Sequence, residues 1–189
     1  MNASNQYIID HCAVVIIAAG ESKRLGTPKQ LLVIQDDTMI NRLIKTVQQA
    51  VDFPIYLVLG ANADKIKTQL YTTKINLVEN RDWKEGMGSS IRVGVQAIVD
   101  SPNKYNGVLI LVCDQPYLTE ASIQALIKLQ EEEKTAITAS FYANVAGTPA
   151  IFHNSIFPEL LALKGDQGAK RIIQERGQEL AKLQFEKGV

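Results

Sequence analysis

Residues 14–30, VVIIAAGESKRLGTPKQ, carry the clearest structural signal in the chain. This stretch begins as a short, wholly apolar run rich in β-branched residues, which is typical of a strand buried on both faces of a parallel sheet. At Gly20 the run passes into a loop that carries the cations Lys23, Arg24 and Lys29. Glycines let backbone N–H groups approach an anion closely, and nearby cations neutralise its charge. The stretch therefore predicts a strand followed by a polyphosphate-binding loop.

Two familiar phosphate-binding loops do not match this segment. The Walker pattern needs four residues between its glycines, followed at once by Lys and Ser/Thr. Here five residues separate Gly20 from Gly26, and two more precede Lys29. The Gly-x-Gly-x-x-Gly pattern of dinucleotide-binding folds is also absent. The alternative is a surface loop with solvated cations. A position at the carboxyl end of a buried strand favours the binding loop, because open α/β sheets bind ligands there.

Length and composition predict one domain spanning residues 1–189. The hydrophobic fraction, 46%, is ordinary for a soluble globular protein. Basic and acidic residues are equal at 20 each, which argues against a nucleic-acid or membrane-surface partner. Two cysteines are too few for a disulfide framework or a structural zinc site. No apolar run approaches the ~20 residues of a membrane span. The polar N-terminus lacks a signal-peptide layout, so we expect a cytoplasmic location.

Strand and helix signals alternate through the first two thirds of the chain. The expected strands after the first are residues 55–59, 75–78 and 108–113, and the expected helices are residues 40–51, 62–70, 86–99 and a segment capped by Thr119. This rhythm predicts a parallel sheet with helices on both faces. The last third of the chain differs from this rhythm. Two strands are expected at residues 135–141 and 146–152, antiparallel in one interpretation, and two helices at residues 155–163 and 166–176.

A second polar cluster, NRDWKEGMGSS at residues 80–90, follows the third expected strand and opens a helix. Its glycines allow close approach of a ligand. Ser89 and Ser90 lie in the first helical turn, where backbone N–H groups have no partner within the helix. Such a helix end suits an anion or a hydroxyl group. The alternative at this position is an ordinary helix cap.

Two carboxylates stand where chemistry is expected. Asp114 directly follows the fourth strand, where a carboxylate is costly unless it is paired or binds a metal. Beside a triphosphate it would hold Mg²⁺ together with phosphate oxygens, and the alternative is an Asp that caps the following turn. Asp166 precedes the last helix, so it is a candidate N-cap and also a second carboxylate for the same metal. The sequence leaves these alternatives open.

Five ordered pieces of the chain together resemble the MobA-like nucleotidyltransferases, and among them the MocA-type molybdenum cofactor cytidylyltransferases. The pieces are Ala18-Ala19-Gly20 with Ser22, Arg24-Leu25-Gly26 and Lys29; Asn80 with Trp83, Gly86-Met87 and Ser89-Ser90; Cys113-Asp114-Gln115-Pro116; Gly147-Thr148-Pro149; and Gly165-Asp166-Gln167-Gly168-Ala169. The resemblance covers residues 13 to about 176. The guanylyl-transferring relatives usually carry Gly where this chain has Ala19, which favours CTP over GTP. Family members usually continue into an Asp-Thr-Pro-Glu-Asp-like segment, and this chain departs from that pattern.

The resemblance implies a three-layer α/β/α Rossmann-like nucleotidyltransferase fold. It implies transfer of CMP from CTP to the phosphate of molybdopterin or molybdenum cofactor, with release of pyrophosphate. A molybdoenzyme that receives the cofactor is a further candidate partner. The alternatives are a nucleotidyltransferase with another nucleotide or phosphorylated acceptor, and a non-catalytic molybdenum cofactor-binding chaperone.

The resemblance also assigns roles to individual residues. Those implied to act in catalysis are Arg24, Lys29 and Asp114. Those implied to hold Mg²⁺ are Asp114 and Asp166. Those implied to contact the nucleotide are Ala18, Ala19, Gly20, Glu21, Ser22, Gly26, Asn80, Ser89 and Ser90.

Overall fold

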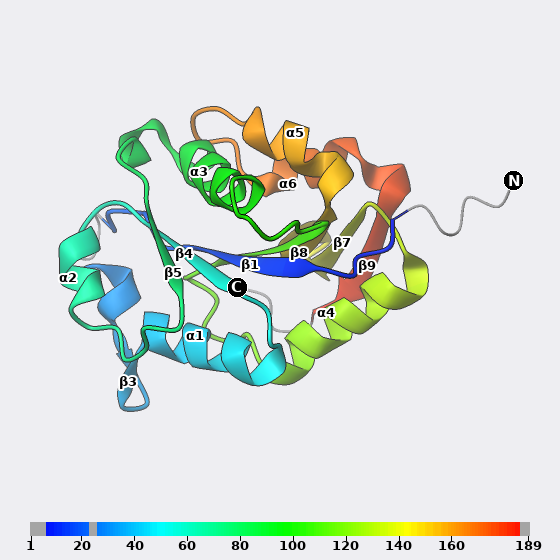
Figure 1. The fold of residues 1–189 in the computed structure, drawn as a ribbon. Coiled ribbons are helices and arrows are strands. Elements are labelled where there is room, and N and C mark those ends of the chain that lie inside the picture. The colour runs from blue at the N-terminus through cyan, green and yellow to red at the C-terminus, as the bar shows by residue number, and fades with distance from the viewer. Residues whose placement is uncertain (1–6, 23–25, 186–189) are drawn as a thin grey trace, which may run out of the picture.

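The computed structural model describes residues 7–22 and 26–185, and a seven-stranded sheet forms its centre (Figure 1). The strand order is β5-β4-β1-β6-β8-β7-β9. Only β8 runs against its neighbours β6 and β7, so the sheet is mostly parallel, as expected. The strands are β1 (Cys12–Ile17), β4 (Ile55–Leu59), β5 (Asn76–Glu79), β6 (Gly107–Val112), β7 (Ile137–Tyr142), β8 (Val145–His153) and β9 (Leu180–Gln184).

Strand β1 is buried along its whole length because helices cover both faces of the sheet. Its side chains alternate between two hydrophobic cores, with Val15 and Ile17 in one and Val14 and Ile16 in the other. The first core is closed by α3 (Met87–Val99), α5 (Phe157–Leu161) and α6 (Ala169–Glu175), and the second by α1 (Met39–Ala50) and α4 (Glu120–Glu133) (Figure 1). This arrangement confirms the three-layer α/β/α fold.

Several local predictions are confirmed and others need correction. Thr119 caps α4, with its hydroxyl oxygen accepting from the Ser122 N–H at 3.2 Å. Strands β7 and β8 do form an antiparallel pair. Helix α2 (Ala63–Lys67) is shorter than the expected 62–70, and α5 and α6 are likewise shorter than expected. Within the described ranges, no helix combines the length and apolar character that crossing a membrane requires.

Two features were not predicted from the sequence. Strands β2 (Val33–Ile34) and β3 (Asp37–Thr38) form a short hairpin whose turn residues, Gln35 and Asp36, have φ angles of 50° and 69°. Two-residue hairpin turns of this kind usually contain Asn-Gly or Asp-Gly, and this hairpin has neither pair. Strand β9 is a sheet edge with a weak apolar pattern, and it acquires its extended form by pairing with β7.

Candidate functional site

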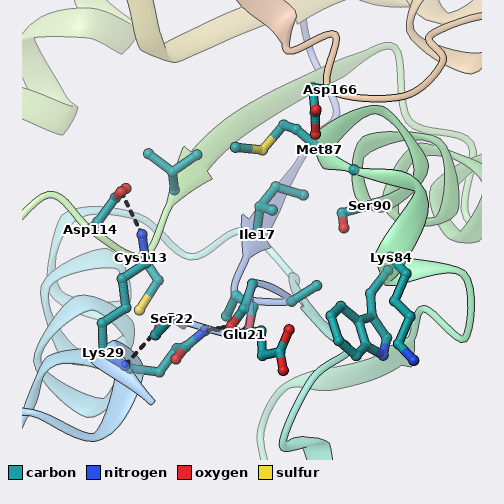
Figure 2. Close-up of a pocket in the computed structure, with 17 residues that line it drawn as sticks. Ile17, Glu21, Ser22, Lys29, Lys84, Met87, Ser90, Cys113, Asp114 and Asp166 are labelled. Atoms are coloured by element: carbon teal, nitrogen blue, oxygen red, sulfur yellow. Dashed lines mark hydrogen bonds and ion pairs between the residues drawn. The ribbon is translucent and has the colours of Figure 1, made fainter. Parts of the chain in front are cut away.

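A cavity of about 580 Å³ opens where β1 and β6 end at their carboxyl termini (Figure 2). The loop after β1, the start of α3, the residues after β6 and the loop before α6 all contribute to its walls. The predicted site residues that line it are Ala18, Ala19, Gly20, Glu21, Ser22, Lys29, Ser90, Asp114 and Asp166. Segments far apart in the chain therefore converge at the sheet edge where α/β proteins bind ligands.

The remaining predicted residues are placed differently. Asn80 and Ser89 lie behind the cavity wall, with exposed fractions of 1% and 0%. The Asn80 side-chain amide donates to the hydroxyl oxygens of Ser89 at 2.8 Å and Ser90 at 3.0 Å, so these groups support Ser90. Gly26 has a φ of 65°, a left-handed conformation that favours glycine. Arg24 lies outside the described residues.

The loop after β1 is held from below by Gln30, a residue that the sequence does not mark as part of the site. This side chain is fully buried, and its Nε2 donates to the carbonyl oxygens of Ala18 and Gly20, each at 2.9 Å. The Lys29 backbone N–H donates to the Ser22 hydroxyl oxygen at 3.0 Å. Nothing in the local pattern marks a glutamine after a loop lysine as structural, because its partners are backbone carbonyls that only the folded loop brings together.

Lys29 and Asp114 form an ion pair at the cavity mouth, with Nζ 2.7 Å from Oδ2 (Figure 2). Their side chains are 33% and 49% exposed, so both groups remain open to a ligand. The carboxylate that follows β6 is therefore paired with a cation, which is one of the arrangements that the sequence predicts for it. Next to it, burial raises the pKa of the Cys113 thiol to about 12. Cys113 thus stays protonated at neutral pH and does not act as a thiolate nucleophile.

Asp166 lines the other side of the cavity, beside Met87 at the start of α3 (Figure 2). It does not cap α6, because that helix begins at Ala169 with Gly168 as its N-cap and no side-chain capping bond. The N-cap alternative is therefore wrong. Nearby, the Arg92 guanidinium and the Gly165 backbone N–H lower the pKa of Glu85 from its ordinary value of 4.5 to about 2.

Gly86 permits the close approach between the start of α3 and the Asp166 loop. Its φ of 123° is a conformation that L-residues rarely adopt, and a Cβ there would lie 2.5 Å from both Asp166 Oδ1 and the Gly165 carbonyl. We expect Gly86→Ala to lower the free energy of unfolding by about 1–3 kcal/mol, the usual cost of such backbone strain. Thermal or urea unfolding measures this.

The control for Gly86→Ala is Gly177→Ala, since a Cβ at Gly177 would meet nothing within 4 Å. This control should be neutral or slightly stabilising, because alanine restricts the unfolded chain. Equal unfolding free energies for the two variants would contradict the tight approach at Gly86.

Residues 14–181 match the MobA-like NTP transferase domain. The chain belongs to this family. The match spans most of the sequence, so the expectation that the chain is a nucleotidyltransferase is confirmed.

Two curated relatives can be aligned with most of this chain. Nicotine blue oxidoreductase of Paenarthrobacter nicotinovorans is 28% identical over 86% of this chain and 81% of its own length. The purine catabolism protein PucB of Bacillus subtilis is 26% identical over 85% of this chain and 79% of its own length. Their names describe different processes, so the names alone do not define the substrate of the MobA-like transferase.

Solved structures show the same architecture. Rv0371c of Mycobacterium tuberculosis superposes with a TM-score of 0.80 at 27% identity, covering 93% of this chain and 88% of that one. A structure of Rv0371c in complex with manganese gives a TM-score of 0.78 at 26% identity, covering 93% of this chain and 89% of that one. A nucleotidyl transferase from Methanothermobacter, at 22% identity and a TM-score of 0.74, supports the fold.

Proposed function

We propose that this MobA-like transferase moves CMP from CTP to the terminal phosphate of a molybdopterin-type pterin and releases pyrophosphate. The observation that carries the proposal is the cavity at the carboxyl ends of β1 and β6, where Lys29, Asp114 and Asp166 meet a glycine-containing loop. The choice of acceptor rests on the ordered motifs described for the MocA-type sequences. A molybdoenzyme is the proposed recipient of the product.

The reaction needs positioning and charge neutralisation more than covalent catalysis. A terminal phosphate oxygen of the acceptor forms a bond to the α-phosphorus of CTP, while the bond between that phosphorus and the oxygen leading to the β-phosphate breaks. The acceptor phosphate and the triphosphate are both negatively charged, and further negative charge develops on the leaving pyrophosphate. Lys29, at the cavity mouth, would neutralise this charge. We propose the same role for Arg24. The loop of Ala18 to Gly20, held by Gln30, would shape the nucleotide site.

The residues at the cavity suit Mg²⁺ or a similar hard cation. Asp114 and Asp166 both line the cavity and offer the carboxylate oxygens that such ions prefer. Over residues 7–22 and 26–185, no group of three or more His, Cys, Asp or Glu residues could hold a metal. We propose that these two carboxylates would share one ion, whose other ligands would be phosphate oxygens and water. When bound, it would supply positive charge that neutralises the phosphates.

The nucleotide preference tests the proposal. Ala19 is buried in the cavity wall, and a Cβ added at Gly60 would lie 2.9 Å from the Ala19 Cβ, so the wall has little room to move there. We expect CTP to be preferred over GTP by roughly 1–3 kcal/mol, the usual range for discrimination by pocket shape. Pyrophosphate release with each nucleotide, with and without molybdenum cofactor, measures this preference.

Ala19→Gly is the matched variant, and its turnover with CTP should exceed its turnover with GTP by less than in the unaltered chain. Equal or faster turnover with GTP by the unaltered chain would refute the cytidylyl assignment. Pyrophosphate release only with another phosphorylated acceptor would refute the pterin assignment. Absence of release with every nucleotide, together with binding of the cofactor, would favour the non-catalytic chaperone.

A further inference from the structure

A group of hydrogen bonds fastens the loop before Asp166 to the start of α3. Arg92 forms a bidentate ion pair with Glu85, with Nη1 2.8 Å from Oε1 and Nη2 2.6 Å from Oε2. The same guanidinium donates to the carbonyl oxygen of Leu163. Glu85 Oε1 also accepts from the Gly165 N–H at 3.2 Å. The two side chains thus hold the loop from both its carbonyl and its amide groups.

The backbone adds a further bond at the same place. The Gly88 N–H donates to the Gly165 carbonyl oxygen at 2.9 Å. Asp166 directly follows Gly165 in the chain. The Asp166 Oδ1 atom lies so close to Gly86 that residue 86 has no space for a side chain. Where the Asp166 carboxylate lies in the cavity therefore depends on how residues 163–165 are fastened to α3.

We propose that Arg92 and Glu85 are positioning residues that hold Asp166 on the cavity wall where it binds the divalent cation; this rests on the proposed metal-binding role of Asp166. Neither residue is among those that line the cavity with Asp166, so both act through the loop. Partly exposed ion pairs ordinarily contribute little to stability. This pair differs because its members also bind two backbone groups of the loop that carries a functional carboxylate.

The test is the Mn²⁺ requirement of the Arg92→Met variant. We expect the Mn²⁺ concentration for half-maximal binding of radiolabelled CTP, measured by equilibrium dialysis, to rise about 10–100-fold, the usual cost of losing a group that orients a metal ligand. The Mn²⁺ dependence of pyrophosphate release should shift in parallel. The matched control is Arg171→Met, which removes an arginine paired with Glu175 at 2.7 Å on α6, and its Mn²⁺ requirement should be unchanged.

Two further comparisons decide between positioning and a general structural effect. Combining Arg92→Met with Asp166→Asn should shift the Mn²⁺ requirement no further than Asp166→Asn alone, because effects exerted through one residue are not additive. Glu85→Gln keeps an oxygen that can accept from Gly165 and should shift the requirement less than Glu85→Ala. If Arg92→Met does not fold, this second pair of variants carries the test.

The outcomes separate the inference from the proposed function. A raised Mn²⁺ requirement in Asp166→Asn with an unchanged one in Arg92→Met would overturn the positioning role and leave the metal role of Asp166 intact. Additive shifts in the double variant would also overturn the positioning role. An unchanged requirement in Asp166→Asn itself would overturn both.

Discussion

Replacement of Lys29 by alanine is expected to lower the rate of pyrophosphate release about 10²–10³-fold, the usual cost of removing one group that stabilises developing charge. The Lys29 ammonium lies at the cavity mouth, with Nζ 2.7 Å from Asp114 Oδ2, on the segment that follows β1. No other described lysine both lines the cavity and pairs with a carboxylate that lines it. In the Lys29→Ala variant, neither the phosphates of a bound nucleotide nor the Asp114 carboxylate would have this cation as a neutralising partner.

The fold should survive the Lys29→Ala change. Partly exposed ion pairs are worth only about 0–1 kcal/mol, so the unfolding temperature should change little. Lys128→Ala is the control, because Lys128 is an exposed lysine on α4 whose nearest carboxylate, Glu132, is 3.8 Å away. It should retain full turnover. Near-normal pyrophosphate release by Lys29→Ala would refute the assignment of this loop to the phosphates.

The second large effect is expected on the metal requirement. Asp114→Asn and Asp166→Asn should each raise the Mg²⁺ concentration for half-maximal activity by about 100-fold, because loss of a metal ligand costs at least as much as loss of a group that orients one. Asparagine keeps the size of the side chain but lacks the negative charge. Measurement of pyrophosphate release over a range of Mg²⁺ concentrations gives the shift for each variant.

Stability should be unaffected by Asp166→Asn, because Asp166 does not cap α6. Asp64→Asn, a change at a fully exposed carboxylate on α2, is the control for loss of one negative charge. A normal Mg²⁺ requirement in Asp166→Asn alongside a raised one in Asp114→Asn would make Asp114 the sole protein ligand. A normal Mg²⁺ requirement in both Asp114→Asn and Asp166→Asn would refute the proposal that the metal binds in this part of the cavity.

Much of the fold could be predicted because its signals are local. The apolar run before Gly20 and the similar runs at β4 and β6 are long enough for a strand and too apolar for a surface. Thr119 begins α4 through a bond to a residue three positions away. The hairpin of β2 and β3 could not be predicted in the same way, because each strand is only two residues long and the turn lacks Asn-Gly or Asp-Gly. The edge strand β9 has residues with weak strand preferences, and its extended form depends on its pairing with β7.

The candidate site divides along the same line. That glycines, cations and carboxylates follow the buried strands can be predicted from the sequence, because each strand and the loop after it are neighbours in the chain. Which of these groups come into contact depends on the tertiary structure. It pairs Lys29 with Asp114, places Asn80 behind the cavity wall, and ties Glu85 to Gly165. These contacts join segments distant in the chain, and packing of the two cores against the sheet, not local preference, determines which side chains come within hydrogen-bonding distance.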